Sequence, residues 1–140
     1  MARVGIVLSG CGALDGTEIH EAFCAMLALS QRGADIVYLA PSGAQRRVVD
    51  HSTRKEIDVE RDMLVEAARI ARGEIVDISK ADAGSLDTVF IPGGFGAARS
   101  LTDFAFALEK MTIIPELERL LTEVYDRGKP LGAVCIATSI

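Results

Sequence analysis

The chain has 140 residues, of which 49% are hydrophobic and 25% charged, and its formal net charge is −5. This length and composition predict one globular domain with a sizeable core. The acidic balance argues against a nucleic-acid partner, and no apolar run reaches the 18 residues or so that a membrane span needs. Three cysteines without metal-site spacing, in a sequence without a signal-peptide pattern, predict free thiols in the cytoplasm.

The first 41 residues predict a strand, a helix and a second strand. Residues 3–9 are an apolar, β-branched run that ends in the turn sequence GCG, and residues 35–41 form a similar run that ends in a proline. Between them the apolar residues follow helical spacing up to Gly33, so this helix should bury one face, made of Ile19, Phe23, Met26 and Leu27. A strand–helix–strand unit of this length predicts a parallel sheet.

Residues 42–59 are polar and of mixed charge, which favours a small excursion hairpin. Arg46 and Arg47 are the densest basic spot in the chain, and we expect them in a solvated loop. Residues 60–73 then show a helical period, and residues 74–78 are expected to be extended.

The second half repeats the alternation of strands and helices. Residues 85–94 predict a core strand with a glycine-rich end, residues 99–111 are expected to be partly helical, and residues 114–130 predict a clear helix with Pro115 in its first turn. Residues 131–137 predict a last strand and the turn after it. The predicted fold class is therefore α/β, a doubly wound sandwich with a mainly parallel sheet, whose ligands bind beyond the carboxyl ends of the strands.

The first of three unusual strand ends reads GCGALDGTE. A dinucleotide-binding loop is disfavoured, because Asp15 stands at the third glycine position and no acidic residue follows the second strand. Glu18 and Glu21 lie one turn apart at the helix start, and we expect them to face the same way. Taken alone, this pattern is better explained by the stabilising effect of acidic residues on the helix N-terminus than by a functional site.

The other two strand ends carry a glycine turn and a cysteine. The sequence PGGFG at residues 92–96 has no Cβ atoms to block a ligand, so its N–H groups could cradle an oxyanion, although a plain turn would need the same glycines. Cys135 follows the last strand, where a strand-to-helix turn would expose its thiolate, whereas a buried apolar cysteine is equally common. The three ends together favour a functional site, because this fold places them side by side.

Four segments carry a resemblance to a known family: SGCGALDGTEIHEA, EAARIARGEI, IPGGFGAARSL and GKPLGAVCIA. They resemble the ElbB proteins (enhancing lycopene biosynthesis), a family of the ThiJ/PfpI, class I glutamine-amidotransferase-like superfamily associated with isoprenoid biosynthesis. The resemblance covers essentially all 140 residues and implies one flavodoxin-like domain. Because such proteins continue well beyond the cysteine, it also implies that the domain lacks its C-terminal third.

By this resemblance Cys135 is the nucleophile on a sharp turn, and Glu21 is the glutamate that pairs with it, with Glu18 as the alternative. Gly94 and the N–H of Ile136 match the oxyanion-hole positions, and Gly93, Phe95 and Cys11 are expected to bind substrate. Many members have a histidine directly after the nucleophile, where this sequence has Ile136. His51 is expected to be solvent-exposed and His20 to lie on the helix surface rather than to act as a base.

The resemblance implies a cofactor-independent glyoxalase of the glyoxalase III type, a lyase or hydratase that converts a small 2-oxoaldehyde to a 2-hydroxy acid. No cofactor and no metal would be needed, and the expected partners are a small carbonyl substrate and a second copy of the chain in a homodimer, with neither nucleic acid nor membrane. Two alternatives stay open: a redox-sensing or regulatory protein that uses the reactive cysteine, and an amidotransferase-like amide hydrolase.

Overall fold

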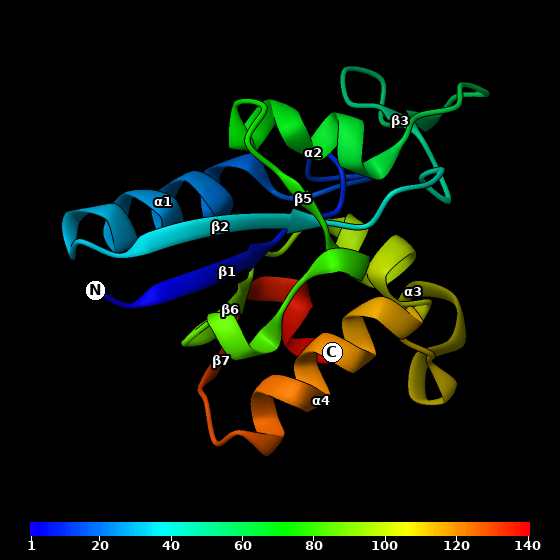
Figure 1. Cartoon of the computed structure of the whole chain (residues 1–140). Helices are drawn as coiled ribbons and strands as arrows, with labels where there is room; N and C mark the ends of the chain where they lie inside the picture. Colours follow the sequence, from blue (N-terminus) through cyan, green and yellow to red (C-terminus); the bar gives the residue numbers. More distant parts are fainter.

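A computed structural model describes all residues from Met1 to Ile140, and its centre is a five-stranded sheet in the order β5-β2-β1-β6-β7 (Figure 1). Every neighbouring pair in this sheet is parallel, which confirms the predicted α/β class. The strands of the sheet, in chain order, are β1 (Arg3–Val7), β2 (Asp35–Ala40), β5 (Val76–Asp77), β6 (Thr88–Ile91) and β7 (Leu131–Ala133).

Helices cover both faces of the sheet. The helices, in chain order, are α1 (Ile19–Gln31), α2 (Met63–Ala71), α3 (Phe104–Ala107) and α4 (Pro115–Asp126). Figure 1 shows α1 and α2 on one side of the sheet and α4 on the other. Each face has its own core: Ile6, Leu8 and Ala22 belong to the cluster under α1 and α2, whereas Leu117 and Leu120 of α4 belong to the larger one.

The segments between these elements also follow the sequence prediction. The expected excursion is a small antiparallel hairpin of β3 (Val49–Asp50) and β4 (Lys55–Glu56). The partly helical stretch consists of a π-helix over Ala97–Leu101, α3 and a 3₁₀ turn over Leu108–Lys110. Pro115 begins α4, where the missing N–H of proline costs no helical hydrogen bond.

The face that α1 turns to the core agrees with the predicted one at Met26 but not at Ile19, Phe23 and Leu27. Ile19, Phe23 and Leu27 are 45%, 58% and 46% exposed, whereas Ala22 is completely buried. Met26 and Leu29 pack against the same cluster as Ala22. Both sets of residues have helical spacing, and the structure buries the one that contains Ala22, whose small side chain permits close approach to the sheet.

None of the helices in this fold is both long enough and apolar enough to cross a membrane.

Replacing Leu120 by alanine should lower the free energy of unfolding by about 2–5 kcal/mol, because the side chain is completely buried under the sheet and its loss leaves a cavity. Urea denaturation followed by circular dichroism measures this loss. Leu27→Ala is the control: Leu27 lies on the exposed side of α1, so its truncation should cost well under 1 kcal/mol. Equal losses in the two variants would contradict the packing described here.

Candidate active site

The loops after β1 and β6 are held together by backbone hydrogen bonds. The N–H of Glu18 donates to the carbonyl of Gly93 at 2.8 Å, and the N–H of Phe95 donates to the carbonyl of Ala13 at 2.8 Å. A third bond runs from Gly96 to the carbonyl of Gly16 at 2.9 Å. Since β7 pairs with β6, the turn that follows β7 lies at the same edge of the sheet. The structure therefore brings the three predicted strand ends together.

Glycine at position 94 is required by both conformation and space. Its φ is +101°, a region that side chains rarely adopt. A Cβ there would stand 2.3 Å from the carbonyl oxygen of Gly16 and 2.4 Å from the nitrogen of Glu18. The glycine loop can approach the start of α1 this closely only because it has no side chain at this point.

Cys135 occupies a turn of unusual geometry. It is the first residue of a 3₁₀ helix (Cys135–Ser139) that follows β7, and its φ is +55°, in the left-handed region. A non-glycine residue there is held in a strained conformation, and such strain is characteristic of functional turns. The residue is exposed, so the predicted presentation of a thiol at the strand-to-helix turn agrees with the geometry.

The carboxylate of Glu21 lies against the same glycine as Cys135. Its Oε2 accepts a hydrogen bond from the N–H of Gly93 at 2.8 Å. A Cβ added to Gly93 would stand 2.4 Å from this Oε2, 2.6 Å from the Cβ of Cys135 and 3.2 Å from its Sγ. The carboxylate and the thiol therefore flank one point on the backbone of Gly93.

Glu18, the alternative partner, is engaged elsewhere. Its side chain caps α1 by accepting a hydrogen bond from the N–H of Glu21 at 2.8 Å, and its other oxygen lies 2.9 Å from Nδ1 of His20. The imidazole of His20 is 92% exposed, as predicted for a helix-surface residue. The expectation that Glu18 and Glu21 face the same way is wrong, because one carboxylate turns toward exposed His20 and the other toward buried Gly93.

The Glu18–His20 contact shifts both titrations. The hydrogen bond from His20 lowers the pKa of Glu18, and the same bond to the carboxylate raises the pKa of His20. The ion pair therefore exists between the lowered pKa of Glu18 and the raised pKa of His20.

Two N–H groups were expected to form an oxyanion hole. The N–H of Gly94 makes no hydrogen bond within the chain, unlike its neighbours Gly93 and Phe95, so this donor is free. Ile136 follows the thiol directly in the 3₁₀ helix, and its side chain packs against the larger core cluster. The catalytic role of both groups stays a prediction.

Of the expected substrate-binding residues, Gly93 borders the thiol, whereas Phe95 lies further along the glycine loop under Arg99 and Cys11 lies beside α2. Burial raises the pKa of the Cys11 thiol, and the charge of Glu66 in α2 raises it further. A thiol with a raised pKa is a poor nucleophile at neutral pH. A role of Cys11 in binding substrate stays a prediction.

The sequence did not indicate that Asp15 and His51 would join the first loop to the hairpin. Asp15 is 2% exposed and accepts a hydrogen bond from the N–H of Val49 at 2.7 Å. Nε2 of His51 accepts from the N–H of Leu14 at 3.1 Å, while Nδ1 lies 3.1 Å from the carbonyl of Val49. The imidazole is 42% exposed, so the expected exposure is only part of its role. The Asp15–Val49 and Leu14–His51 hydrogen bonds join residues more than 30 positions apart, so no local pattern could have revealed them.

Arg99 is the other residue that the sequence did not single out. Its guanidinium donates to the carbonyl of Leu14 at 3.1 Å and lies 4.8 Å from the centre of the Phe95 ring. It thus contacts both loops of the candidate site, and its stacking on the ring is a cation–π contact. In sequence, Arg99 is one of many basic residues with no distinguishing neighbour.

No group of three or more His, Cys, Asp and Glu side chains lies in a position to hold a metal ion. The chemistry that these residues offer is that of a thiol nucleophile with a neighbouring carboxyl group and a free amide donor.

The sequence and the structure were compared with those of known proteins, and several are similar over nearly the whole chain. The chain is 46% identical over 137 residues to the human protein named glutamine amidotransferase-like class 1 domain-containing protein 3, mitochondrial. It is 35% identical over 140 residues to the zebrafish ES1 protein, also mitochondrial by name. The crystal structure of an isoprenoid biosynthesis protein with an amidotransferase-like domain from Ehrlichia chaffeensis superposes with a TM-score of 0.92 at 38% identity over 97% of this chain.

The chain has the fold of the class I glutamine amidotransferase-like, DJ-1/ThiJ/PfpI superfamily. A DJ-1 superfamily protein from Agrobacterium tumefaciens, with a TM-score of 0.53 at 20% identity over 99% of this chain and 55% of its own, shares the fold alone. No model of a known protein family matches the sequence.

The chain spans about half the length of the curated relatives that it matches: 51% of the human protein and 52% of the zebrafish protein. The alignments with the human and zebrafish proteins include 97% and 96% of this chain, respectively. The chain covers 64% of the Ehrlichia structure. The expected cytoplasmic location stays a prediction, since the names of the human and zebrafish relatives place those proteins in mitochondria.

Substituting Glu18 by glutamine should lower the pKa of His20 toward its ordinary value, because the hydrogen-bonded carboxylate that stabilises the imidazolium is removed. Titration of the imidazole resonances by NMR measures this change. The stabilising effect of the pair is present below the unfolded pKa of His20 and is lost as the pH rises through its raised folded pKa. The difference in free energy of unfolding between wild type and Glu18→Gln should therefore shrink as the pH rises through the folded pKa of His20. An unchanged pKa of His20 in the variant would contradict the pairing.

Proposed function

We propose that this protein is a cofactor-independent glyoxalase-like enzyme that converts a small 2-oxoaldehyde to a 2-hydroxy acid. The observation that carries the proposal is the position of Cys135, in a left-handed turn and exposed, with the carboxylate of Glu21 on the same glycine. A nucleophile and a proton carrier at one point are the minimum that such a reaction requires.

The proposed reaction begins when the thiolate of Cys135 adds to the aldehyde carbon, whose π electrons move to the oxygen. The resulting oxyanion is stabilised by the free N–H of Gly94, together with that of Ile136. Protonation of this oxygen gives a hemithioacetal bound to the sulfur.

Glu21 then removes the proton from the former aldehyde carbon, and the electron pair moves to the neighbouring carbonyl, which gives an enediol. Return of a proton to the second carbon produces a thioester of the 2-hydroxy acid. Water hydrolyses the thioester and releases the acid and the free thiol. One carbon is oxidised and its neighbour reduced, so the reaction consumes only water and needs no external redox partner.

The narrower assignment to the ElbB proteins forms part of this proposal. It is supported by the Ehrlichia relative, whose name includes isoprenoid biosynthesis. The homodimer expected from the sequence also stays a prediction. For the amide-hydrolase alternative, the described residues offer little support, because the imidazoles of His20 and His51 are bonded to Glu18 and to the first loop.

Cys135→Ser should abolish the formation of lactate from methylglyoxal, and Glu21→Gln should lower it by about 10²-fold or more, because proton transfer by a positioned acid or base contributes a factor of this order. Lactate is quantified enzymatically, beside parallel assays with glutamine and simple esters. Cys24→Ser and Glu18→Gln are the matched controls, since Cys24 is exposed on α1 and Glu18 turns away from the thiol. Wild-type turnover in Cys135→Ser would refute the assignment, and ammonia release from glutamine would favour the amide hydrolase.

A second candidate function uses the same exposed thiol without turnover. Cys135 is accessible to peroxide, and its sulfur lies close to a carboxyl group that could hydrogen-bond an oxidised product. If the protein is a redox sensor, a titration with hydrogen peroxide followed by mass spectrometry should give sulfinic acid at Cys135 before any oxidation of Cys11 or Cys24. No turnover on any carbonyl substrate should accompany it. Equal oxidation of Cys24 and Cys135 would contradict the sensor.

A further inference from the structure

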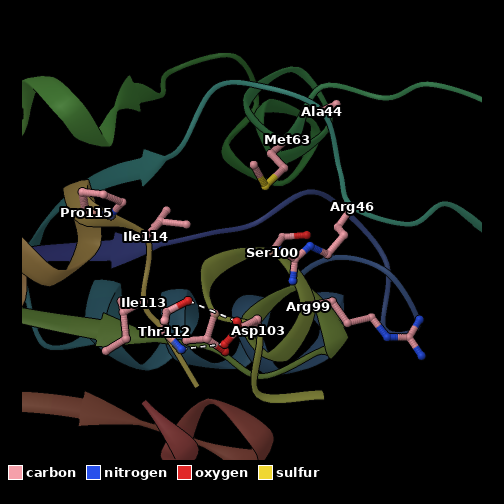
Figure 2. A pocket seen from close by; sticks show the side chains of 11 residues that line it. Ala44, Arg46, Met63, Arg99, Ser100, Asp103, Thr112, Ile113, Ile114 and Pro115 are labelled. Atoms are coloured by element: carbon pink, nitrogen blue, oxygen red, sulfur yellow. Dashed lines mark hydrogen bonds between the residues drawn. The ribbon is translucent and has the colours of Figure 1, made fainter. Parts of the chain in front are cut away.

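The molecule has a cavity of about 280 Å³ outside the candidate active site, between the π-helix, the start of α4 and the segment before the hairpin (Figure 2). Ligand pockets in proteins typically measure about 300–1,000 Å³, so this one suits a small molecule. Met63, Ile113 and Ile114 supply its apolar lining, and its polar lining includes Arg46, Ser100 and Asp103.

The hydroxyl of Ser100 is an unusual feature of this cavity. Its Oγ is buried and has no hydrogen-bond partner. Buried hydroxyls in folded proteins are nearly always bonded, because an unpaired one costs about 1–3 kcal/mol. Ser100 lies in the π-helix Ala97–Leu101, and π-helical turns are concentrated at functional sites. An unpaired hydroxyl at a cavity wall is a group that a ligand would satisfy.

Arg46 brings a positive charge to the same cavity. Its guanidinium stacks on the ring of Phe106 at 5.3 Å and forms none of the salt bridges in the structure. In Figure 2 its side chain reaches toward Ser100, whereas the side chain of Arg99 leads away from the cavity. The guanidinium of Arg46 is thus held in place by an aromatic ring, with its N–H groups free for a ligand.

Asp103 brings a negative charge to the cavity, which favours a monoanionic ligand over a dianion. Asp103 is bonded to the N–H of Thr112 at 2.6 Å and to its hydroxyl at 3.1 Å, and these bonds hold the pKa of its carboxyl below the usual range. Because the side chain of Arg99 leads away, Arg46 and Asp103 bring one charge of each sign to the cavity. A dianion such as phosphate would be repelled by Asp103 more strongly than a singly charged carboxylate.

We propose that this cavity binds a small monocarboxylate with a short hydrocarbon chain, whose carboxylate accepts hydrogen bonds from Arg46 and Ser100 and whose chain contacts Met63, Ile113 and Ile114. Guanidinium and carboxylate groups pair well because two N–H groups match two oxygens. This site is separate from the proposed reaction and does not depend on it.

Isothermal titration of the purified protein with propionate tests the proposal, with propionamide as the uncharged analogue and inorganic phosphate as the dianion. Propionate should bind saturably, and propionamide and phosphate at least about tenfold more weakly, because charge-assisted hydrogen bonds are the stronger class. Arg46→Gln and Ser100→Ala should each weaken propionate binding by about tenfold. Ser100→Ala should not lower the Tm of the free protein, since it removes an unsatisfied buried hydroxyl.

Arg47→Gln is the matched control. Arg47 is the neighbouring arginine, stacks on the same Phe106 ring at 5.1 Å and does not line the cavity. This variant should bind propionate like wild type, as should Cys135→Ser. Absence of saturable binding, equal binding of propionamide, tighter binding of phosphate, or equal loss in Arg46→Gln and Arg47→Gln would overturn the proposal. Loss of binding in Cys135→Ser would place the ligand at the thiol instead.

Discussion

The two hydrogen bonds between Gly93 and the start of α1 are the interaction on which the candidate site depends. One runs from the N–H of Glu18 to the carbonyl of Gly93, and the other from the N–H of Gly93 to the carboxylate of Glu21. Together they use both backbone groups of one peptide residue to fix a helix that begins more than 70 positions earlier in the chain. The glycine loop and the glutamate therefore form one rigid unit, and the thiol after β7 is added to it by strand pairing.

The supporting residues around this unit are polar groups that depend on distant backbone partners. Asp15 is buried and accepts from Val49, and His51 receives the N–H of Leu14, so the small hairpin braces the first loop. Arg99 braces it from the other side through the carbonyl of Leu14. A site built on loops gains precision when such contacts restrict the loops, because catalysis tolerates little displacement of its groups.

The alternation of strands and helices could be predicted from the sequence, because apolar periodicity and glycine or proline turns report local structure directly. The three strand ends could be combined into a site for the same reason: parallel topology determines which edge they share. The sequence pattern did not fully predict the buried face of α1, because two sets of residues in this helix have the same helical spacing. The buried stripe of α1 through Ala22 and the exposed stripe through Phe23 are both helical, and only the packed sheet distinguishes them.

Spacing alone did not distinguish Glu21 from Glu18, since residues one turn apart look equivalent until a hydrogen-bond partner is placed; the preference for Glu21 came from the family resemblance. Arg99, Asp15 and His51 escaped detection because their partners are separated from them by tens of residues. Interactions of this kind depend on tertiary structure, which composition and spacing do not contain.

The π-helix at Ala97–Leu101 has a consequence for how this region could change during evolution. The hydrogen bonds of a π-helix span five residues instead of the four of an α-helix. Deleting one amino acid from it would therefore give a regular α-helical turn with little strain in the backbone. The deletion would rotate Arg99 by about 100° around the axis, away from Leu14 and Phe95. The length of the segment Ala97–Leu101, rather than the identity of its residues, would then decide whether Arg99 still contacts Leu14 and Phe95.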